Sequence, residues 1–76
     1  MMVELVSFIA KSLVDNPEAV EVREVEELDA IIIELRVAPD DMGKVIGKQG
    51  RIAKAIRSIV KAATLKNTKP VFVEIV

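Results

Sequence analysis

The sequence contains no cysteine and no histidine. Disulfide bonds, zinc sites made of cysteine and histidine, and catalysis by Cys/His or Ser/His pairs are therefore excluded. Without such cross-links the fold depends on a hydrophobic core, and 51% of the residues are hydrophobic. A chain of 76 residues has room for one core only. We therefore expect a single domain over residues 1–76, with no metal site and no cofactor.

Long apolar runs are also missing. The longest apolar stretch falls well short of the roughly 18 residues that a membrane-spanning helix needs. Near the N-terminus, Glu4 and Ser7 interrupt the region that would have to form the hydrophobic part of a signal peptide. We therefore expect a cytoplasmic protein with no membrane partner.

Basic residues are few in the first half of the sequence and acidic residues are few in the second half, although the net charge of the whole is only −1. Residues 1–42 contain three basic and eleven acidic residues, a net charge of −8. Residues 43–76 contain eight basic residues and one acidic residue, a net charge of +7. A basic half on a nearly neutral protein is typical of a local binding site for a polyanion. The alternative is that the two halves pair with each other across the surface, and composition does not separate these two interpretations.

The first half of the sequence predicts a helix followed by a β-hairpin. Apolar residues at helical spacing indicate a helix over residues 2–14, which ends at an Asp-Asn-Pro turn. Its apolar arc is broad, and we expect most of it to pack on a sheet, the alternative being contact with a partner. Alternating valines indicate a strand over residues 19–26, with a bulge or an early end where the alternation slips at Val25. After a weak turn, residues 30–38 form the clearest strand. Its expected core face consists of Ile31, Ile33, Leu35 and Val37.

The second half predicts two helices and a last strand. Pro39–Asp41 combines a rigid turn with a candidate helix N-cap, which favours a short helix over residues 42–46 that ends at Gly47. Residues 51–65 form the cleanest amphipathic helix in the sequence. After a loop, residues 70–76 predict a strand that starts with a proline. The expected apolar face of the long helix comprises Ile52, Ile56, Ile59, Val60 and Ala63, and its expected basic face Arg51, Lys54, Arg57, Ser58 and Lys61.

This order of elements, helix, strand, strand, helix, helix, strand, predicts an α+β fold. The two helices between the second and third strands form a crossover, which normally joins parallel neighbours with right-handed sense. The hairpin that precedes them is antiparallel. We therefore expect a three-stranded mixed sheet with the helices packed on one of its faces.

The glycines at positions 43, 47 and 50 can be compared with loops that bind phosphate. The stretch "GKVIGKQ" has one residue too few for the Walker pattern and carries Gln49 where a magnesium-binding hydroxyl belongs. The dinucleotide fingerprint needs a further glycine that is absent. The pattern G-x-x-G between two helices fits residues 47–50. By itself this spacing is common in ordinary turns, so its context decides its meaning.

Two glycines at this spacing allow close backbone contact with a sugar-phosphate chain. Glycine lacks a Cβ atom and readily adopts a positive φ where one helix ends and the next begins. A helix that starts near Arg51 would direct its free N–H groups and positive end toward the loop, which favours a phosphate there. Lys48 and Gln49 at the tip can bind phosphate oxygens, and such contacts hold a strand without reading its sequence.

The stretch "VIGKQGRIAKAIRSIVKAA" resembles the core of a KH domain, with a glycine loop between two helices, after a β-hairpin and before a last strand. The order of elements over residues 1–76 is similar to the type II, prokaryotic KH arrangement. A chain of this size resembles the small bacterial single-KH proteins of the KhpA group. The resemblance implies a non-enzymatic RNA chaperone or post-transcriptional regulator. Its implied partners are single-stranded RNA and either a second copy, as a homodimer, or a larger, KhpB-like KH protein, as a heterodimer.

In KH domains the glycine loop and its flanking helices form one wall of a cleft that holds about four nucleotides, and the last strand with the loop before it forms the other. The resemblance implies that these walls are residues 44–57 and 66–72. The implied binding residues are Gly47, Lys48, Gln49 and Gly50 in the loop, Arg51 and Lys54 after it, and Lys44 and Ile46 before it. For Ile46, core packing is an equal alternative. Arg57 and Lys61 are expected on a solvated helix face.

Aromatic residues are few, because the sequence has two phenylalanines and neither tyrosine nor tryptophan. RRM, OB-fold and cold-shock proteins stack bases on exposed aromatic side chains, so these classes are disfavoured, whereas a KH cleft holds bases by apolar contact and edge hydrogen bonds. The alternative function is a protein–protein module whose basic half contacts an acidic partner. Catalysis has the least support, because no histidine, cysteine or nucleophile arrangement accompanies the acidic residues.

Overall fold

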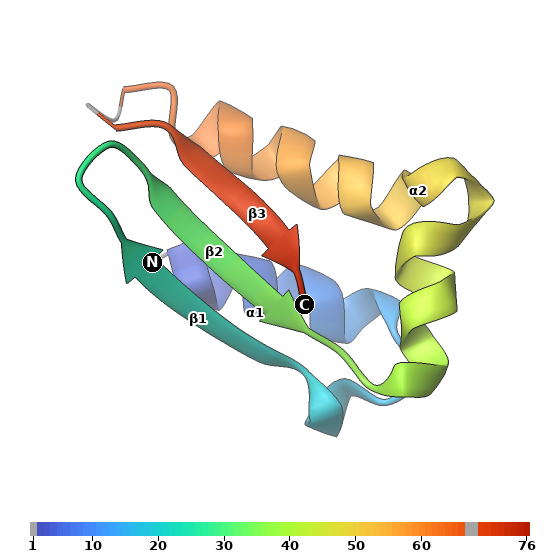
Figure 1. The fold of residues 1–76 in the computed structure, drawn as a ribbon. Helices are drawn as coiled ribbons and strands as arrows, with labels where there is room; N and C mark the ends of the chain where they lie inside the picture. Colours follow the sequence, from blue (N-terminus) through green and yellow to red (C-terminus); the bar gives the residue numbers. More distant parts are fainter. Residues whose placement is uncertain (1, 67–68) are drawn as a thin grey trace.

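The computed structural model describes residues 2–66 and 69–76, the side chain of Lys48 excepted, and over these residues the chain folds as a three-stranded sheet with helices on one face (Figure 1). The expected α+β class and mixed sheet are confirmed. Asn67 and Thr68 of the expected loop lie outside the described residues. The elements in chain order are α1 (Met2–Leu13), η1 (Pro17–Ala19), β1 (Glu21–Glu26), β2 (Ile31–Arg36), α2 (Pro39–Ala63) and β3 (Val71–Ile75).

The segment between α1 and β1 contains a short 3₁₀ helix, η1, that the sequence pattern did not predict. Pro17 is its first residue, and the fixed φ of proline suits the first position of a helical turn. The turn closes when the Val20 N–H donates to the carbonyl oxygen of Pro17 at 3.1 Å. The strand therefore begins at Glu21, two residues later than the valine alternation indicated.

The sheet has the strand order β1-β2-β3, with β2 in the centre. β1 and β2 pair antiparallel as a hairpin, and β2 and β3 pair in parallel through the crossover, as expected. The expected bulge or early end of β1 is wrong, because pairing with β2 is unbroken as far as Glu26. Val22 lies opposite the buried Leu35, whereas Val25 lies opposite Ile32 on the other face. The alternation of apolar residues slips at Val25 because the side chains of these two valines lie on different faces of the sheet.

The two helices expected around the glycine loop are the two halves of α2, Pro39–Ala63, which meet at a bend. Its ribbon changes direction sharply between its two halves, in the yellow part of Figure 1. Gln49 and Gly50 have positive φ angles at this bend. The expected N-cap is also wrong, because Ala38 occupies that position and Pro39 is the first helical residue.

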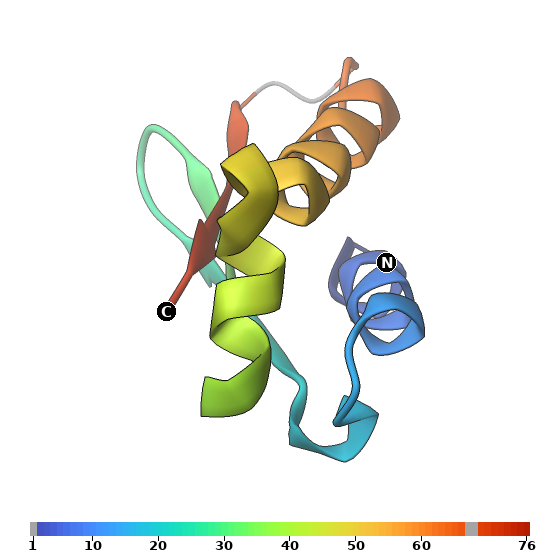
Figure 2. The same cartoon turned by 90° about the vertical axis from the view of Figure 1, so that its right-hand side faces the viewer.

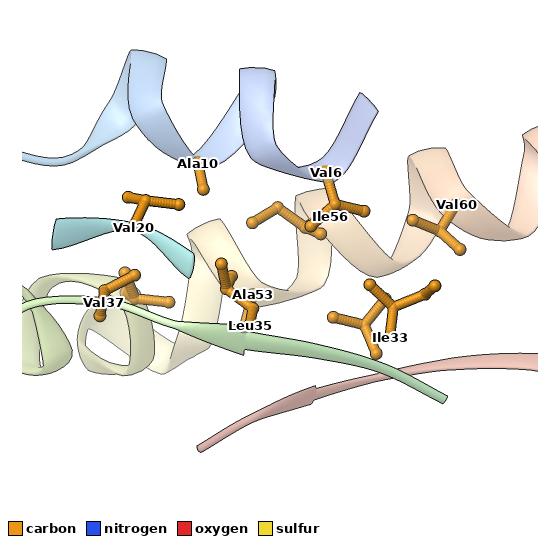
Figure 3. Close-up of a cluster of buried hydrophobic side chains, with 11 residues drawn as sticks. Val6, Ala10, Val20, Ile33, Leu35, Val37, Ala53, Ile56 and Val60 are labelled. Carbon is orange, nitrogen blue, oxygen red and sulfur yellow. The ribbon is translucent and has the colours of Figure 1, made fainter. Parts of the chain in front are cut away.

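The core lies between the sheet and the helices, which Figure 2 shows on the same side of the strands. The expected strand face is confirmed, since Ile33 and Leu35 are fully buried and point toward the helices in Figure 3. On α1, Val6 and Ala10 are buried, so this helix packs on the sheet as expected. Within the described ranges, no helix is both long enough and apolar enough to cross a membrane.

The core stripe of α2 differs from the expected stripe at three positions. Ile56 and Val60 are buried, as expected, but Ala53 is buried as well. Ile59 is instead 42% exposed, and Ala63 is exposed too. A helix that lies on a flat sheet buries a narrow stripe, and the side of that stripe is set by how the helix is rotated on the sheet.

Candidate nucleic-acid interface

Residues 47–50 form the bend of α2, which we call the glycine corner. Gly50 has a φ of 70°, a backbone conformation that favours glycine, and Gln49 adopts nearly the same conformation with a φ of 64°. A Cβ atom added at Gly47 or Gly50 would meet nothing within 4 Å, so the backbone at both positions faces open space. Another chain can therefore approach the backbone at this corner.

The left-handed residues Gln49 and Gly50 interrupt the right-handed helical backbone just before Arg51, near which the second helix was expected to start. Attraction of a phosphate to the N–H groups that follow these two residues stays a prediction. The structure also gives this corner an open backbone at Gly47 and Gly50 and several exposed side chains. The expected role of Lys48 concerns a side chain outside the part of the chain that the structure describes.

The residues just before the corner divide between core and surface. Val45 is buried in the core, whereas its neighbour Ile46 is 52% exposed. The alternative role of Ile46 in core packing is therefore wrong. Its exposed apolar side chain lies at the corner, where it is accessible to a ligand.

A row of basic side chains follows the corner along the second half of α2. Arg51, Lys54, Arg57 and Lys61, which we call the basic stripe, are all exposed, as the helical pattern predicted. They recur every three or four residues, so they lie along one side of the helix. Among the described side chains, none of the four has a carboxylate within 4.0 Å. The stripe is therefore available to an external anion.

A groove of about 470 Å³ lies between the second half of α2 and β3. Its lining combines basic and apolar side chains. Arg57 crosses it, because its Nε donates to the carbonyl oxygen of Val73 at 3.3 Å. The residues lining the groove are Arg57, Lys61, Thr64, Leu65, Lys69, Pro70, Val71, Phe72 and Val73.

The groove includes two residues that the sequence analysis assigned to a solvated helix face. Arg57 and Lys61 are exposed, as expected, but they also form the α2 side of the groove, opposite the start of β3. The sequence signal for these two residues was their helical spacing from Lys54, which places them in the basic stripe. That spacing could not identify them as groove residues without knowing where β3 packs against α2.

Only part of the opposite charge in the two halves is paired. Lys44 Nζ lies 3.2 Å from Asp15 Oδ1, and Lys69 Nζ lies 2.8 Å from Glu26 Oε2. Among the described side chains these are the ion pairs that join the basic half to the acidic half. The pairing of the two halves is thus real but limited, and it leaves the basic stripe free.

Asp41 is a buried carboxylate that joins the segment after α1 to the start of α2. Its Oδ1 accepts a hydrogen bond from the Asp15 N–H, and its Oδ2 accepts one from the Asn16 N–H, both at 3.0 Å. The bond from Asp15 lowers the pKa of Asp41, the bonds from Asn16 and the charge of Lys44 lower it further, and burial opposes them. Asp41 thereby holds the backbone of Asp15 and Asn16 close to the turn of α2 that contains Lys44.

Comparison with protein families finds a match between residues 3–75 and the model of the KhpA/KhpB KH domain. The chain is 69% identical to the RNA-binding protein KhpA of Caldanaerobacter subterraneus subsp. tengcongensis, over 99% of this chain and 100% of that protein. It is 67% identical to the RNA-binding protein KhpA of Clostridium perfringens over the same shares. The RNA-binding protein KhpA of Aquifex aeolicus is 51% identical, over 95% of this chain and 91% of the relative.

Among solved structures, the fold is similar to part of Era, in a crystal structure with MgGDPNP and nucleotides 1506–1542 of 16S ribosomal RNA. The TM-score is 0.62 at 21% sequence identity, and the match covers 99% of this chain and 30% of the Era chain. At this identity the similarity concerns the fold alone.

Proposed function

Because the chain belongs to the KhpA/KhpB KH-domain family, we propose that it is a non-enzymatic RNA-binding protein that holds about four nucleotides of single-stranded RNA in a cleft. The observation that carries the proposal is the unpaired basic stripe, which runs from the glycine corner to the groove beside β3. A surface of this kind offers cations to phosphates and apolar contact to bases.

The sugar-phosphate backbone would pass the glycine corner, where the open backbone at Gly47 and Gly50 allows close approach. Arg51 and Lys54 are the first cations beyond the corner, and Lys44 precedes it. Such contacts hold a strand in place and contribute affinity that falls with salt.

The bases would turn toward the groove. Leu65 and Pro70 provide apolar surface there, and both are exposed and therefore accessible to a base. Lys61 and Lys69 add positive charge along the groove. Ile46, exposed at the corner, would add apolar contact at the other end of the cleft.

In the cell, the proposed role is that of an RNA chaperone or post-transcriptional regulator in the cytoplasm. One small cleft gives modest affinity, and a second KH domain raises it through avidity. We therefore propose that the chain acts as a homodimer or as a heterodimer with a larger, KhpB-like KH protein. The matching family model covers the KH domains of both KhpA and KhpB.

The test is the double variant Lys48→Asp/Gln49→Asp, which places two negative charges at the tip of the glycine corner. Aspartate tolerates the positive φ of position 49 well, so the fold should persist. We expect an unchanged far-UV circular dichroism spectrum and thermal midpoint. Binding of a fluorescein-labelled oligouridylate, measured by fluorescence anisotropy, should be lost.

Lys11→Asp is the control for reversing the charge of one lysine. Lys11 lies exposed in the last turn of α1, outside the proposed cleft. This variant should bind the oligouridylate almost as well as the wild-type protein. Full RNA binding by the double variant would show that the cleft assignment is wrong.

A further inference from the structure

We propose that two carboxylates of the acidic half compete with RNA phosphates for basic residues of the cleft. They are Asp15, which pairs with Lys44, and Glu26, which pairs with Lys69. The inference rests on the proposed RNA binding and adds a function for residues outside the cleft. These acids would act as internal counterions that RNA has to displace.

The pair at the first wall joins the α1–β1 connection to α2. Lys44 Nζ donates to Asp15 Oδ1 at 3.2 Å, three residues before the glycine corner begins. Both side chains are substantially exposed, so neither is committed to the core. A phosphate that approaches the corner can therefore reach Lys44 only in competition with a carboxylate already bound to it.

Asp15 is held in place for this contact and is more than a passing surface charge. Its backbone N–H donates to the buried carboxylate of Asp41, as does the N–H of Asn16. The backbone at position 15 is therefore anchored to the first turn of α2. Since Lys44 lies on the same helix one turn later, the anchor keeps the two charges close.

The pair at the second wall joins the groove to the β1–β2 hairpin. Lys69 Nζ donates to Glu26 Oε2 at 2.8 Å and to the carbonyl oxygen of Glu27 at 3.0 Å. Lys69 also lines the groove beside β3. Its charge is thus partly neutralised at a position where it lines the groove.

The two pairs affect affinity more than stability. An exposed ion pair contributes little to the free energy of folding, because water and salt screen it. It still has to be broken, or shared, when a phosphate takes the lysine. The acidic half would thereby weaken binding to any polyanion and leave recognition to strands that also fill the groove.

The experiment measures oligouridylate binding by fluorescence anisotropy for wild-type protein, Asp15→Asn and Glu26→Gln. We expect each variant to bind about two- to five-fold more tightly than wild type, the range set by the energy of an exposed ion pair. The log–log salt dependence should also steepen, because each freed lysine then exchanges small counterions for phosphate.

Glu24→Gln is the matched control, because Glu24 lies on the same strand and face as Glu26 and has the same charge. Among the described residues it has no ion pair. A gain for Glu24→Gln equal to that of Glu26→Gln would overturn the inference, since the effect would then be one of net charge. A persistent gain for Asp15→Asn in a Lys44→Gln background would overturn it too, because Asp15 would then act without Lys44.

Failure of the proposed function has a different signature. In that case the wild-type protein itself would not bind the oligouridylate, and the variants would have no affinity to change. Wild-type binding combined with unchanged affinity in Asp15→Asn and Glu26→Gln would contradict the counterion role alone.

Discussion

Gln49 and Gly50 both have left-handed backbone conformations, with φ angles of 64° and 70°. For glycine this conformation carries no steric penalty, whereas for glutamine it is uncommon. Backbone strain of this kind persists where the surrounding structure imposes it, and it is frequent at binding sites. The sequence indicated that a glycine would adopt a positive φ, but it gave no sign that Gln49 would share it.

The two glycines of the corner should respond oppositely to alanine. Gly50→Ala should lower the free energy of unfolding by about 1–2 kcal/mol, because alanine disfavours a positive φ. Gly47→Ala should instead raise it by up to about 1 kcal/mol, because Gly47 lies within α2 without a positive φ and alanine favours helix. Urea denaturation measures both changes.

RNA binding by the same two variants should not follow their stabilities. Each substitution adds a methyl group to a backbone surface that faces open space, so both should weaken oligouridylate binding. Equal signs for the two stability changes would contradict the assigned backbone conformations. Unaltered binding by both variants would contradict close approach of RNA to the corner.

At the scale of elements, Asp41 fastens the start of α2 to the segment that follows α1. The expected N-cap role would have satisfied the helix that contains it, whereas the observed hydrogen bonds go to Asp15 and Asn16, far away in the sequence. The carboxylate therefore stabilises the packing of two elements and leaves the cap of its own helix unaided.

Asp41→Asn should destabilise the protein in a pH-dependent manner. The hydrogen bonds lower the pKa of Asp41 in the folded protein, below the value of about 3.9 in an unfolded chain. The resulting stabilisation is fully present above that value and is lost as the pH falls through the lower folded pKa. We expect wild type to have a clearly higher urea midpoint than Asp41→Asn at pH 7, and a smaller advantage at pH 3. An equal difference at both pH values would show that the charge of Asp41 is not involved.

The elements themselves could largely be predicted from local patterns. Hydrophobic alternation identified β2 and its core face, and helical spacing identified the second half of α2. The predictions that were wrong were those that depend on tertiary packing. Adjacent apolar residues such as Val45 and Ile46 look alike in a sequence, and only the docking of the helix on the sheet decides which is buried.

The candidate site, too, could be predicted from local patterns only in part. The glycine spacing and the basic residues after it were visible in the sequence, and the structure confirms that Arg51 and Lys54 are exposed. The contributions of Arg57 and Lys61 to the groove depend on β3, which is distant along the chain. The buried role of Asp41 likewise depends on a partner far away in the sequence, and no local pattern contains that information.

At the scale of the whole molecule, large apolar side chains remain exposed on the helical layer. Phe8 of α1 is 71% exposed, the largest exposed fraction among the large hydrophobic side chains of that helix. Such a side chain can become buried where two copies of the protein meet. We expect light scattering at high protein concentration to give about twice the monomer mass of 8.3 kDa. Phe8→Ser should shift this equilibrium toward the monomer.

Leu28→Ser serves as the control for the loss of an exposed apolar side chain. Leu28 is 90% exposed, but it lies in the turn of the β1–β2 hairpin. This variant should retain the oligomeric state of the wild type. A protein that stays monomeric at high concentration, both alone and mixed with a larger KH protein, would contradict the proposed assembly.

The parallel pairing of β2 with β3 also determines when the groove can form. β2 finds its first neighbour through a short hairpin, but Ile31 meets Val71 only after the whole of α2 has crossed the sheet. Contacts between such distant positions close slowly and tend to form late in folding. The groove therefore needs both α2 and β3 in their native places, and a chain without the β2–β3 pairing lacks the wall that faces the basic stripe. Capture of RNA in the groove would then be a property of fully folded molecules only.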